Sequence, residues 1–362
     1  MIEEWQQRIL EAASSGTKLQ ICGGGSKAFY GQTPKGELIN TSDHSGIVDY
    51  EPSELVITAK GGTPLIALEK ALAEQQQMLA FEPPHFGSKN GTQATIGGCI
   101  AAGLSGPRRA RAGSARDFVL GTQLLDGNGK LLNLGGQVMK NVAGYDVSRF
   151  LAGSMGILGI ISEVSLKVLP LPEFEQTLVF DIEQQAALNT LCEWASKPLP
   201  ISASAWYQGQ LHLRLSGAEP AVMAAAKQLG GEPLETTKAK LFWQQLCDHQ
   251  HPFFANDEQA LWRLALPATT PTLAIDGIDD TNTLLEWNGS QRWLNIDLDI
   301  DANILRQAVT VLGGHATLFR NGDKQQGVFT PLSAPLMMLH KNLKQAFDPQ
   351  AVFNPGRLYP NL

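Results

Sequence analysis

The sequence predicts an α+β fold divided into two domains, and three observations support this. The chain has 362 residues, more than the roughly 250–300 at which a single hydrophobic core stops growing. Of its 36 glycines, 25 lie before Pro172, whereas six of its seven tryptophans lie after it. Strand and helix patterns do not alternate strictly in the first half, so a doubly wound parallel sheet fits poorly.

The first half is predicted to be mixed α/β. Ile2, Trp5, Ile9 and Leu10 share one face of an N-terminal helix. Asp126-Gly127-Asn128-Gly129 between two apolar runs is typical of a β-hairpin. The expected strands cover residues 18–22, 55–59, 78–81, 118–125, 130–134 and 158–168, and helices are expected at 64–76 and 145–151.

The change of composition coincides with Leu169-Pro170-Leu171-Pro172. Alternate prolines fit neither a helix nor a central strand, so we place the domain boundary there. A small α+β domain is expected to follow. Its helices are predicted at 183–196 and 220–229 and its strands at 203–215 and 291–298, with a last helix at 334–347.

Charge and cysteine usage exclude several classes of protein. The net charge is −7 with no long basic run, which excludes a nucleic-acid binder or a polybasic membrane-surface protein. The four cysteines form no C-x-x-C pair, so neither an iron–sulfur cluster nor a Cys₄ zinc site is expected. Cys247, His249 and His251 have metal-ligand side chains but no distant partner pattern, so no metal is expected. With no signal peptide or spanning stretch evident, we expect a cytoplasmic protein that reaches the inner membrane only through partners.

Three glycine-rich segments indicate a ligand that lies close to the main chain. The first, residues 21–28, follows a strand and exposes backbone N–H groups for a pyrophosphate. The second, residues 94–103, precedes four arginines at 108, 109, 111 and 116, which supply charge for an anion. In the third, residues 140–161, glycines interrupt an apolar strand.

A nicotinamide-binding Rossmann fold is a weaker alternative. Residues 23–28 satisfy G-x-G-x-x-A, the dinucleotide fingerprint. However, Gly31, Pro34 and Gly36 forbid the helix whose N-terminus should hold the phosphate.

Taken in order, these segments resemble the FAD-binding domain of the vanillyl-alcohol oxidase, or PCMH-type, flavoproteins. The shared patterns are a Gly-rich loop, T-I-G-G with R-x-G-x-x-R-D, and G-Y-D with G-S-x-G-x-L-G-I-I, and residues 347–356 resemble that family's ending. Within it, residues 82–85, 106–109 and 138–146 resemble the FAD-binding E subunits of glycolate oxidases. The resemblance implies a PCMH-type FAD-binding domain of two α/β subdomains with a smaller α+β cap. We therefore expect an FAD-binding domain at 1–171, a cap at 172–325, and a segment at 326–362 that returns to the first domain.

The same resemblance implies which residues contact the FAD, through the two phosphate loops, the cofactor lining and the closing strand. They are Gly23, Gly24, Gly25, Ser26, Lys27, Thr95, Ile96, Gly97, Gly98, Gly113, Ser114, Asp117, Gly159, Ile160, Ile161 and Asn354. Members that bind FAD covalently often have His where this chain has Ser26, so we expect non-covalent FAD.

The implied function is the FAD-binding subunit of a glycolate oxidase. It would oxidise glycolate, and D-lactate as a second substrate, to the 2-oxo acid, with a homologous FAD-containing subunit and an iron–sulfur subunit as partners. Such chemistry needs a cation for the carboxylate and a base for the hydroxyl proton; His315, Arg109 and Tyr145 are the candidates, and the base stays unassigned. Two alternatives stay open. A non-catalytic flavin-carrying or assembly subunit is favoured by departures from the family pattern, such as those at Gly103 and Met155. A stand-alone FAD-dependent 2-hydroxy-acid dehydrogenase would need an identifiable base and a carboxylate clamp.

Overall fold

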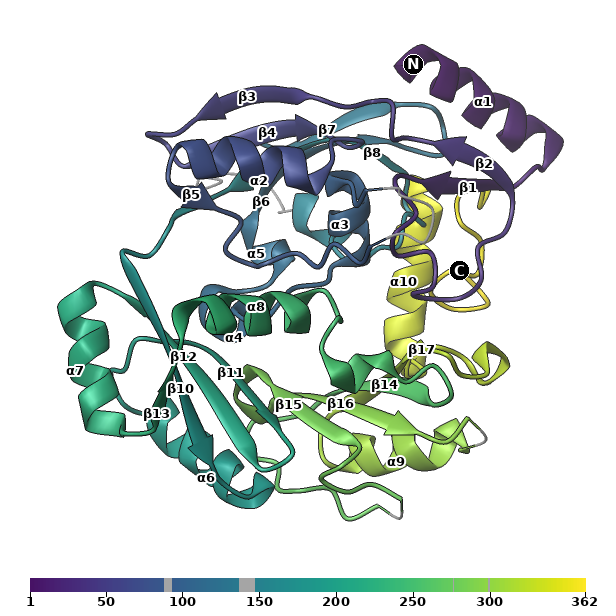
Figure 1. Ribbon diagram of the computed structural model, residues 1–362. Coiled ribbons are helices and arrows are strands. Elements are labelled where there is room, and N and C mark those ends of the chain that lie inside the picture. The colour runs from purple at the N-terminus through teal and green to yellow at the C-terminus, as the bar shows by residue number, and fades with distance from the viewer. Residues whose placement is uncertain (88–92, 137–146, 276, 299) are drawn as a thin grey trace. The chain divides into compact units, whose positions relative to one another are not determined.

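The computed structural model describes residues 1–87, 93–136, 147–275, 277–298 and 300–362, which form two compact units (Figure 1). Unit 1 comprises Met1–Leu104, Ser114–Pro170 and Pro331–Leu362, and unit 2 comprises Ser105–Gly113 and Leu171–Thr330. The chain therefore enters unit 2 twice, the first time for only nine residues. The assignment of the units to an FAD-binding domain and a cap stays a prediction.

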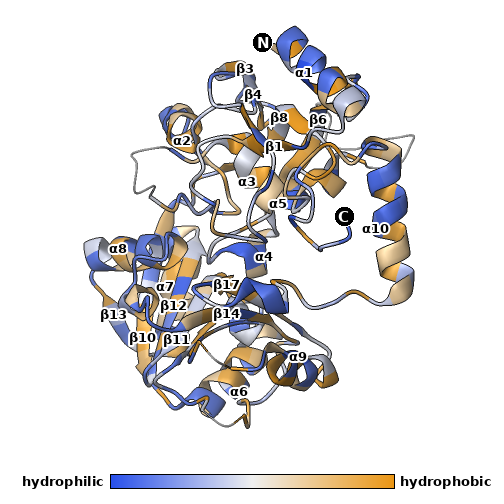
Figure 2. Cartoon of the chain, turned by 90° about the vertical axis from the view of Figure 1, so that its right-hand side faces the viewer, coloured by the Kyte–Doolittle hydropathy of each residue, from blue (hydrophilic) through white to orange (hydrophobic). Residues whose placement is uncertain are grey.

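A five-stranded antiparallel sheet forms the centre of unit 1. Its order is β3-β4-β8-β6-β7, with bounds Ile47–Glu51, Val56–Lys60, Ile160–Lys167, Val119–Leu125 and Leu131–Gly135. β6 and β7 form the predicted hairpin, which is thereby confirmed. Asp126 caps its turn by accepting hydrogen bonds from the amides of Asn128 and Lys130. Figure 2 shows β6 and β8 largely in hydrophobic colours, as buried strands require.

A smaller parallel pair of strands lies beside the N-terminal helix. β1 (Leu19–Cys22) pairs with β2 (Glu37–Asn40), and α1 (Ile2–Ser15) packs on them. Trp5, Ile9 and Ala12 of α1 share a core with residues of both strands, because their spacing places them on one helical face. The expected absence of a helix after the glycine triad is confirmed, since the chain continues through turns to β2.

The remaining elements of unit 1 are short, apart from two helices. They are α2 (Leu65–Glu74), β5 (Gln77–Met78), α3 (Ile96–Ala102), α5 (Ala115–Phe118), the 3₁₀ helix η1 (Ser148–Leu151), β9 (Leu169–Pro170) and α10 (Ala334–Phe347). The helix predicted at 334–347 is confirmed. The strand predicted at 78–81 is wrong beyond Met78, because the chain turns there: the amide of Glu82, whose φ is 47°, donates to the carbonyl of Leu79.

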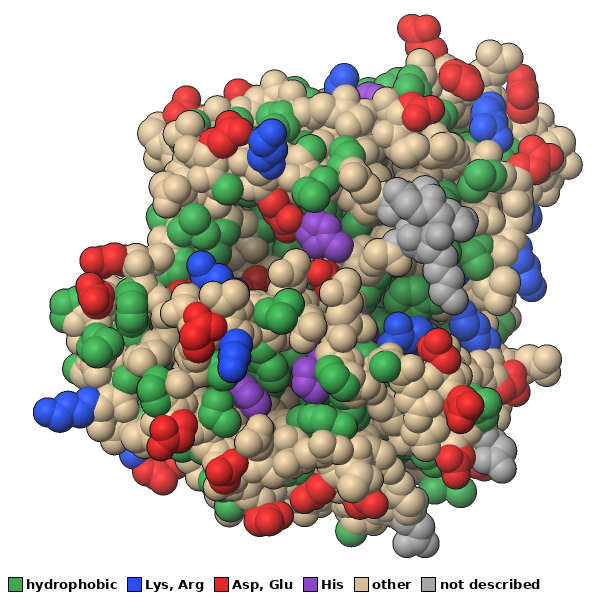
Figure 3. Space-filling model, viewed as in Figure 1, with side chains coloured by type: hydrophobic (Ala, Val, Ile, Leu, Met, Phe, Trp, Pro, Cys, Tyr) green, Lys and Arg blue, Asp and Glu red, His purple; other side chains and the backbone are tan. Residues whose placement is uncertain are grey.

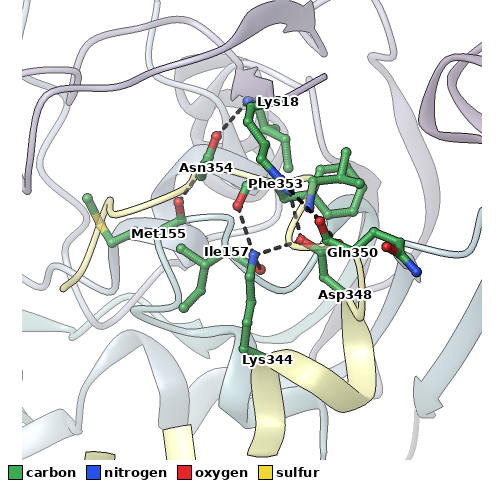
Figure 4. Close-up of polar contacts among 10 residues, drawn as sticks. Lys18, Met155, Ile157, Lys344, Asp348, Gln350, Phe353 and Asn354 are labelled. Atoms are coloured by element: carbon green, nitrogen blue, oxygen red, sulfur yellow. Dashed lines mark hydrogen bonds and ion pairs between the residues drawn. The ribbon is translucent and has the colours of Figure 1, made fainter. Parts of the chain in front are cut away.

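The C-terminal segment is fixed in unit 1 by a buried lysine (Figure 4). Lys344 of α10 is 5% exposed, and its ammonium lies 2.7 Å from the Asp348 carboxylate. It also donates to the carbonyls of Ile157 and Phe353, at 2.7 and 2.9 Å. Asp348 in turn accepts from the amides of Val352 and Phe353. Burial lowers the pKa of Lys344, and Asp348 opposes that shift.

Unit 2 is built on an eight-stranded antiparallel sheet. Its order is β13-β10-β12-β11-β15-β16-β14-β17, with bounds Glu232–Leu234, Phe174–Asp181, Gln210–Gly217, Ile201–Tyr207, Thr283–Glu286, Gln291–Ile296, Ala260–Ala265 and His315–Arg320. The run predicted as strand at 203–215 is two strands, because Gln208 and Gly209 both have positive φ and form a tight turn. The strand predicted at 291–298 and the helices at 183–196 and 220–229 are confirmed within a few residues.

The two faces of this sheet differ in character. One face is apolar and packs on α6 (Gln184–Ala195), α7 (Glu219–Leu229) and α9 (Ala302–Val311). The opposite face carries charged and polar side chains, and we call it the polar face. By strand register it includes Thr177, His212, Arg214, Glu286, Gln291, Trp293, Arg263, His315 and Thr317. In Figure 1, α8 (Thr236–Cys247) and α4 (Arg109–Ala112) lie on this side.

Histidines and aromatic rings pack together at one end of α8. His212 stacks on Phe242 with ring centroids 4.0 Å apart, and His249 stacks on Phe254 at 3.9 Å. His249 and His251 lie in the turn that follows α8, which ends at Cys247. Among the described residues, no group of three or more His, Cys, Asp or Glu side chains is placed to hold a metal ion.

The surface agrees with the acidic composition. On the face drawn in Figure 3, acidic side chains are spread over the described residues and basic side chains occur only in small groups. None of the helices in the described part of the chain is long and apolar enough to cross a membrane.

Removing the buried ammonium tests how the C-terminal segment is held. Lys344→Met leaves the Asp348 charge buried without its partner, so the free energy of unfolding should fall by about 3–5 kcal/mol. The exposed Lys341 of the same helix provides a matched control. Lys341→Met should change the free energy of unfolding by less than about 0.5 kcal/mol. Urea unfolding followed by circular dichroism measures both, and equal effects would contradict the account.

Acid should destabilise unit 2 through its buried histidines. Burial, and then the charge of His251, lowers the pKa of His212 from 6.5 to about 4. Between these values the unfolded chain binds the proton more readily, so the free energy of unfolding falls as the pH is lowered from 6.5 to 4, by about 3 kcal/mol for His212. In His212→Gln this part of the pH dependence should disappear. Tryptophan fluorescence during urea unfolding at several pH values measures it, with His340→Gln as the control that keeps the wild-type slope.

Candidate functional site

Unit 1 contains a pocket of about 100 Å³, built around the first glycine-rich segment. Residues from four separate parts of the chain line it. They are Gln20, Ile21, Cys22, Gly23, Gly24, Gly25, Ser26, Lys27, Ala28, Pro34, Thr95, Gly98, Ala101, Ala102, Met155, Asn354 and Arg357. The structure therefore brings together eight of the predicted FAD contacts: residues 23–27, Thr95, Gly98 and Asn354.

Each glycine of the triad is required by the backbone around it. A Cβ on Gly23 would collide with the Thr95 hydroxyl, and one on Gly24 would collide with the carbonyl of Gln93. Gly25 has a φ of +70°, which side chains disfavour. The backbone of the loop between β1 and β2 is thus pressed against Thr95 and Gln93 at the start of α3, with no room for a side chain on Gly23 or Gly24.

Three backbone donors of this loop have no acceptor among the residues that the structure describes. Within the described part of the chain, the amide N–H groups of Gly24, Gly25 and Ser26 make no hydrogen bond. They line the pocket together with Lys27, whose ammonium lies 5.5 Å from the centre of the Phe86 ring. Consecutive amides of this kind bind anions, so the loop fits the diphosphate of FAD.

Two residues near the C-terminus complete the pocket wall. Asn354 accepts from the amide of Ile21 at 2.8 Å and donates to the carbonyl of Met155 at 2.7 Å, which joins β1 to the turn before β8 (Figure 4). Arg357 donates to the carbonyls of Ala28, at 3.0 Å, and Gln32. Burial lowers its pKa to about 10, so its guanidinium stays positively charged at neutral pH. Burial also raises the pKa of the Cys22 thiol, against the opposing charge of Arg357.

The second predicted phosphate loop is a short helix. Thr95 is the N-cap of α3, and its hydroxyl accepts from the amide of Gly98 at 3.4 Å. Gly97 is buried inside unit 1, where its amide donates to the carbonyl of Gly61 and a Cβ would meet that carbonyl at 2.8 Å. Ile96 is fully buried as well. Thr95 and Gly98 line the pocket, whereas Ile96 and Gly97 do not.

Other predicted contacts lie away from this pocket. Ser114 and Asp117 form a capping box at α5, in which the amide and the hydroxyl of Ser114 each donate to the Asp117 carboxylate at 2.8 Å. These bonds lower the pKa of Asp117 although burial opposes them. Gly159 is tucked against the carbonyl of Leu125, and Ile160 and Ile161 are buried in β8. Gly113 ends the short segment that belongs to unit 2. Their contact with FAD stays a prediction.

The three catalytic candidates fall into two groups. Tyr145 lies outside the described residues, as do residues 137–146 generally. Arg109 and His315 both belong to unit 2. The guanidinium carbon of Arg109 lies 4.3 Å from the centre of the Trp287 ring, and His315 opens β17. Partial desolvation lowers the pKa of His315, and the charges of Arg263 and Arg109 lower it further.

Sequence reasoning missed several residues of the pocket. Arg357 is the most informative, because it supplies a buried charge and holds the loop that follows the glycine triad. Its signal was its position directly after Asn354-Pro355-Gly356, a run already noted as resembling a family ending. Cys22, Ala101, Ala102 and Met155 also line the pocket; they lie within the three glycine-rich segments, although none of them was named as an FAD contact.

Comparisons with known proteins bear on the family of this chain and not on its individual site residues. The family model of an FAD binding domain matches residues 2–135. The chain is 46% identical to the glycolate oxidase subunit GlcE of Escherichia coli (strain K12), over 98% of this chain and 97% of that protein. It is 33% identical to the glycolate oxidase subunit GlcD of Bacillus subtilis (strain 168), over 52% of this chain and 38% of that protein.

A solved structure, that of alkyldihydroxyacetonephosphate synthase, has a similar fold. The TM-score is 0.67 at 16% identity, over 98% of this chain and 76% of that chain, which is a likeness of fold alone. The family assignment rests on the identity to GlcE of Escherichia coli, which extends over nearly the full length of both proteins. The chain belongs to the family of the glycolate oxidase subunit GlcE, and it has the PCMH-type fold of an FAD-binding domain joined to a second unit.

Proposed function

We propose that this chain is the FAD-binding subunit of a glycolate oxidase that converts glycolate to glyoxylate. One observation carries the proposal: the amides of Gly24, Gly25 and Ser26 have no acceptor among the described residues. These residues line the pocket of unit 1, and the chain belongs to the GlcE family. A diphosphate bound there would receive these donors and the nearby charges of Lys27 and Arg357.

The chemistry assigns separate tasks to the cofactor and to the chain. Oxidation of glycolate removes a hydride from the hydroxyl carbon and a proton from the hydroxyl oxygen, and bound FAD supplies the hydride acceptor. The chain holds the FAD without a covalent bond, since Ser26 offers no nucleophile comparable with a histidine ring. D-lactate differs from glycolate by one methyl group and is the second substrate we propose.

The electrons leave through other subunits. The sequence has four separated cysteines and no C-x-x-C pair that would hold an iron–sulfur cluster. We therefore assign onward electron transfer to an iron–sulfur subunit and propose a second, homologous FAD-containing subunit beside it. Attachment to the inner membrane, on this proposal, is through those partners.

A pair of glycine substitutions tests the FAD site. Gly25 and Gly16 both have positive φ, +70° and +78°, and a Cβ at Gly16 meets nothing within 4 Å. Alanine at either position should lower the free energy of unfolding by about 1–2 kcal/mol. Only Gly25→Ala alters the amides that face the pocket, so it alone should weaken FAD binding, by about tenfold or more. Flavin fluorescence titration measures the affinity, and an equal loss in Gly16→Ala would contradict the site.

The flavin spectrum tests the reaction. The purified chain should show a flavin absorbance that bleaches on anaerobic addition of glycolate, and acid precipitation should release the flavin into solution because it is not covalently bound. The same titration with D-lactate tests the second substrate.

Two outcomes would contradict parts of the proposal. A flavin that persists with glycolate, both alone and in the purified complex, would make the chain a non-catalytic flavin carrier. A colourless chain that cannot be loaded with FAD would overturn the FAD assignment for this pocket.

A further inference from the structure

We infer that unit 2 contains a binding site for a small amino acid in its zwitterionic form. The site is a pocket of about 490 Å³, a volume typical of small-molecule sites. It is lined by the start of α6, by strands β15 and β16, and by the loop that precedes β15. All of these belong to unit 2, so the inference is independent of the FAD pocket and goes beyond the proposed function.

Two polar side chains of the sheet project from its apolar face at this pocket. Thr283 of β15 lies opposite Leu294, and Arg292 of β16 lies opposite Leu285. Thr283 and Arg292 are therefore diagonal neighbours on the face that carries these leucines, both of which belong to the apolar cores. Polar groups buried in such surroundings need partners.

Arg292 brings a positive charge that no carboxylate of the described residues balances. It is 1% exposed, and its guanidinium donates to the carbonyls of Gly289, Pro271 and Thr270, which uses three of its five N–H groups. Among the residues that the structure describes, it forms no ion pair. Burial lowers its pKa to about 10, so the guanidinium stays charged at neutral pH. An anionic group in the pocket would balance this charge.

Thr283 and Gln184 also line the pocket, and their polar groups lack partners. Thr283 is 3% exposed, and its buried hydroxyl has no hydrogen-bond partner in the described part of the chain. Gln184, the first residue of α6, is 6% exposed, and its side-chain amide makes no hydrogen bond to a described residue. Unlike the hydroxyl, this amide is not fully enclosed, so a group in the pocket can reach it. Such groups favour a ligand that supplies their partners.

The first turn of α6 adds backbone donors beside Gln184. The N-cap residue Glu183 makes no side-chain hydrogen bond to the helix. The amides of residues 184–186 have no acceptor within the described ranges. Open amides and the partial positive charge at the N-terminus of a 12-residue helix suit a carboxylate, as do the guanidinium of Arg292 and the amide of Gln184.

The loop before β15 brings negative charge to the same pocket. Asp279 and Asp280 both line it, and neither forms an ion pair with a residue that the structure describes. One oxygen of Asp279 accepts from the amide and the hydroxyl of Thr281, and the other accepts no bond from the described residues. Asp280 is partly buried; burial, followed by the charges of Glu183 and Asp279, raises its pKa. An ammonium group would relieve this repulsion and form charge-assisted hydrogen bonds.

Unbalanced charges of both signs thus line one pocket, and they define the ligand. A zwitterion satisfies both, with its carboxylate toward Arg292 and Gln184 and its ammonium group toward Asp280. A simple acid would leave the aspartates unbalanced, and a simple amine would leave the guanidinium unbalanced. Leu273 and Ile278 also line the pocket and provide apolar contacts for a short methylene chain.

Calorimetric titration of the full chain tests the site with three amino acids of increasing length, which are glycine, 3-aminopropanoate and 4-aminobutanoate. At least one should bind with a dissociation constant of about 1 mM or lower, and the series shows which length spans the two charges. The acid and the amine of the same length, such as butanoate and butylamine, each satisfy only one end. Both should bind at least about tenfold more weakly than the amino acid.

Substitutions at both ends of the site test the assignment. Asp280→Asn should weaken amino-acid binding by about tenfold or more, because the ammonium group loses its charged partner. Gln184→Met and Thr283→Val keep the approximate shape of the side chain and should weaken binding by about three- to tenfold. Neither removes a hydrogen bond to a described residue, so their melting temperatures should equal or exceed that of wild type. Asp297→Asn, at an exposed aspartate of unit 2, is the control that should leave binding unchanged.

Three results would each overturn the inference. They are no binding of any of the three amino acids at about 10 mM, equal binding of the matching acid or amine, and unchanged affinity in folded Asp280→Asn and Gln184→Met variants. The flavin plays no part in this measurement. A chain that oxidises glycolate but binds no amino acid would therefore contradict only this site, and the reverse result would contradict only the proposed function.

Discussion

The fit between the β1–β2 loop and the start of α3 is the constraint on which the rest of unit 1 depends. Gly23 and Gly24 bring their backbone against Thr95 and Gln93, at a distance that excludes any side chain. Gly24, Gly25 and Ser26 line the pocket, and within the described residues their amides find no acceptor. Without a ligand these donors are open to water, and a bound anion can replace that water, so the packing that shapes the loop also makes it suitable for an anion.

The C-terminal segment stabilises this arrangement from a distance of more than 300 residues. Asn354 receives the amide of Ile21, 333 positions earlier, and Arg357 binds carbonyls of the loop itself. Both depend on the buried pair of Lys344 and Asp348, which fixes the end of α10 and the chain that follows it. The FAD-binding surface is therefore assembled from both ends of the sequence, and removal of the last residues would open the pocket as well as destabilise the unit.

Local signals in the sequence were sufficient for part of the structure. Three features depend on residues that are neighbours in the sequence, and each was predicted from its pattern. They are the Asp-Gly-Asn-Gly turn, the helix at 334–347 and the glycine triad. Features that depend on long-range packing were not predictable in this way. The strand at 78–81 ends early because Glu82 turns the chain, and Ser105–Gly113 belongs to unit 2 although its sequence neighbours on both sides belong to unit 1.

The central claim is that the amides of Gly24, Gly25 and Ser26 hold the FAD diphosphate, and amide hydrogen exchange measures this most directly. Without FAD, these three amides should exchange at nearly the rate of an unstructured chain, because no protein acceptor among the described residues protects them. On addition of FAD their exchange should slow by at least tenfold, while amides of unit 2, such as those of β10, keep their rates. Protection of residues 24–26 that is the same with and without FAD would contradict the account.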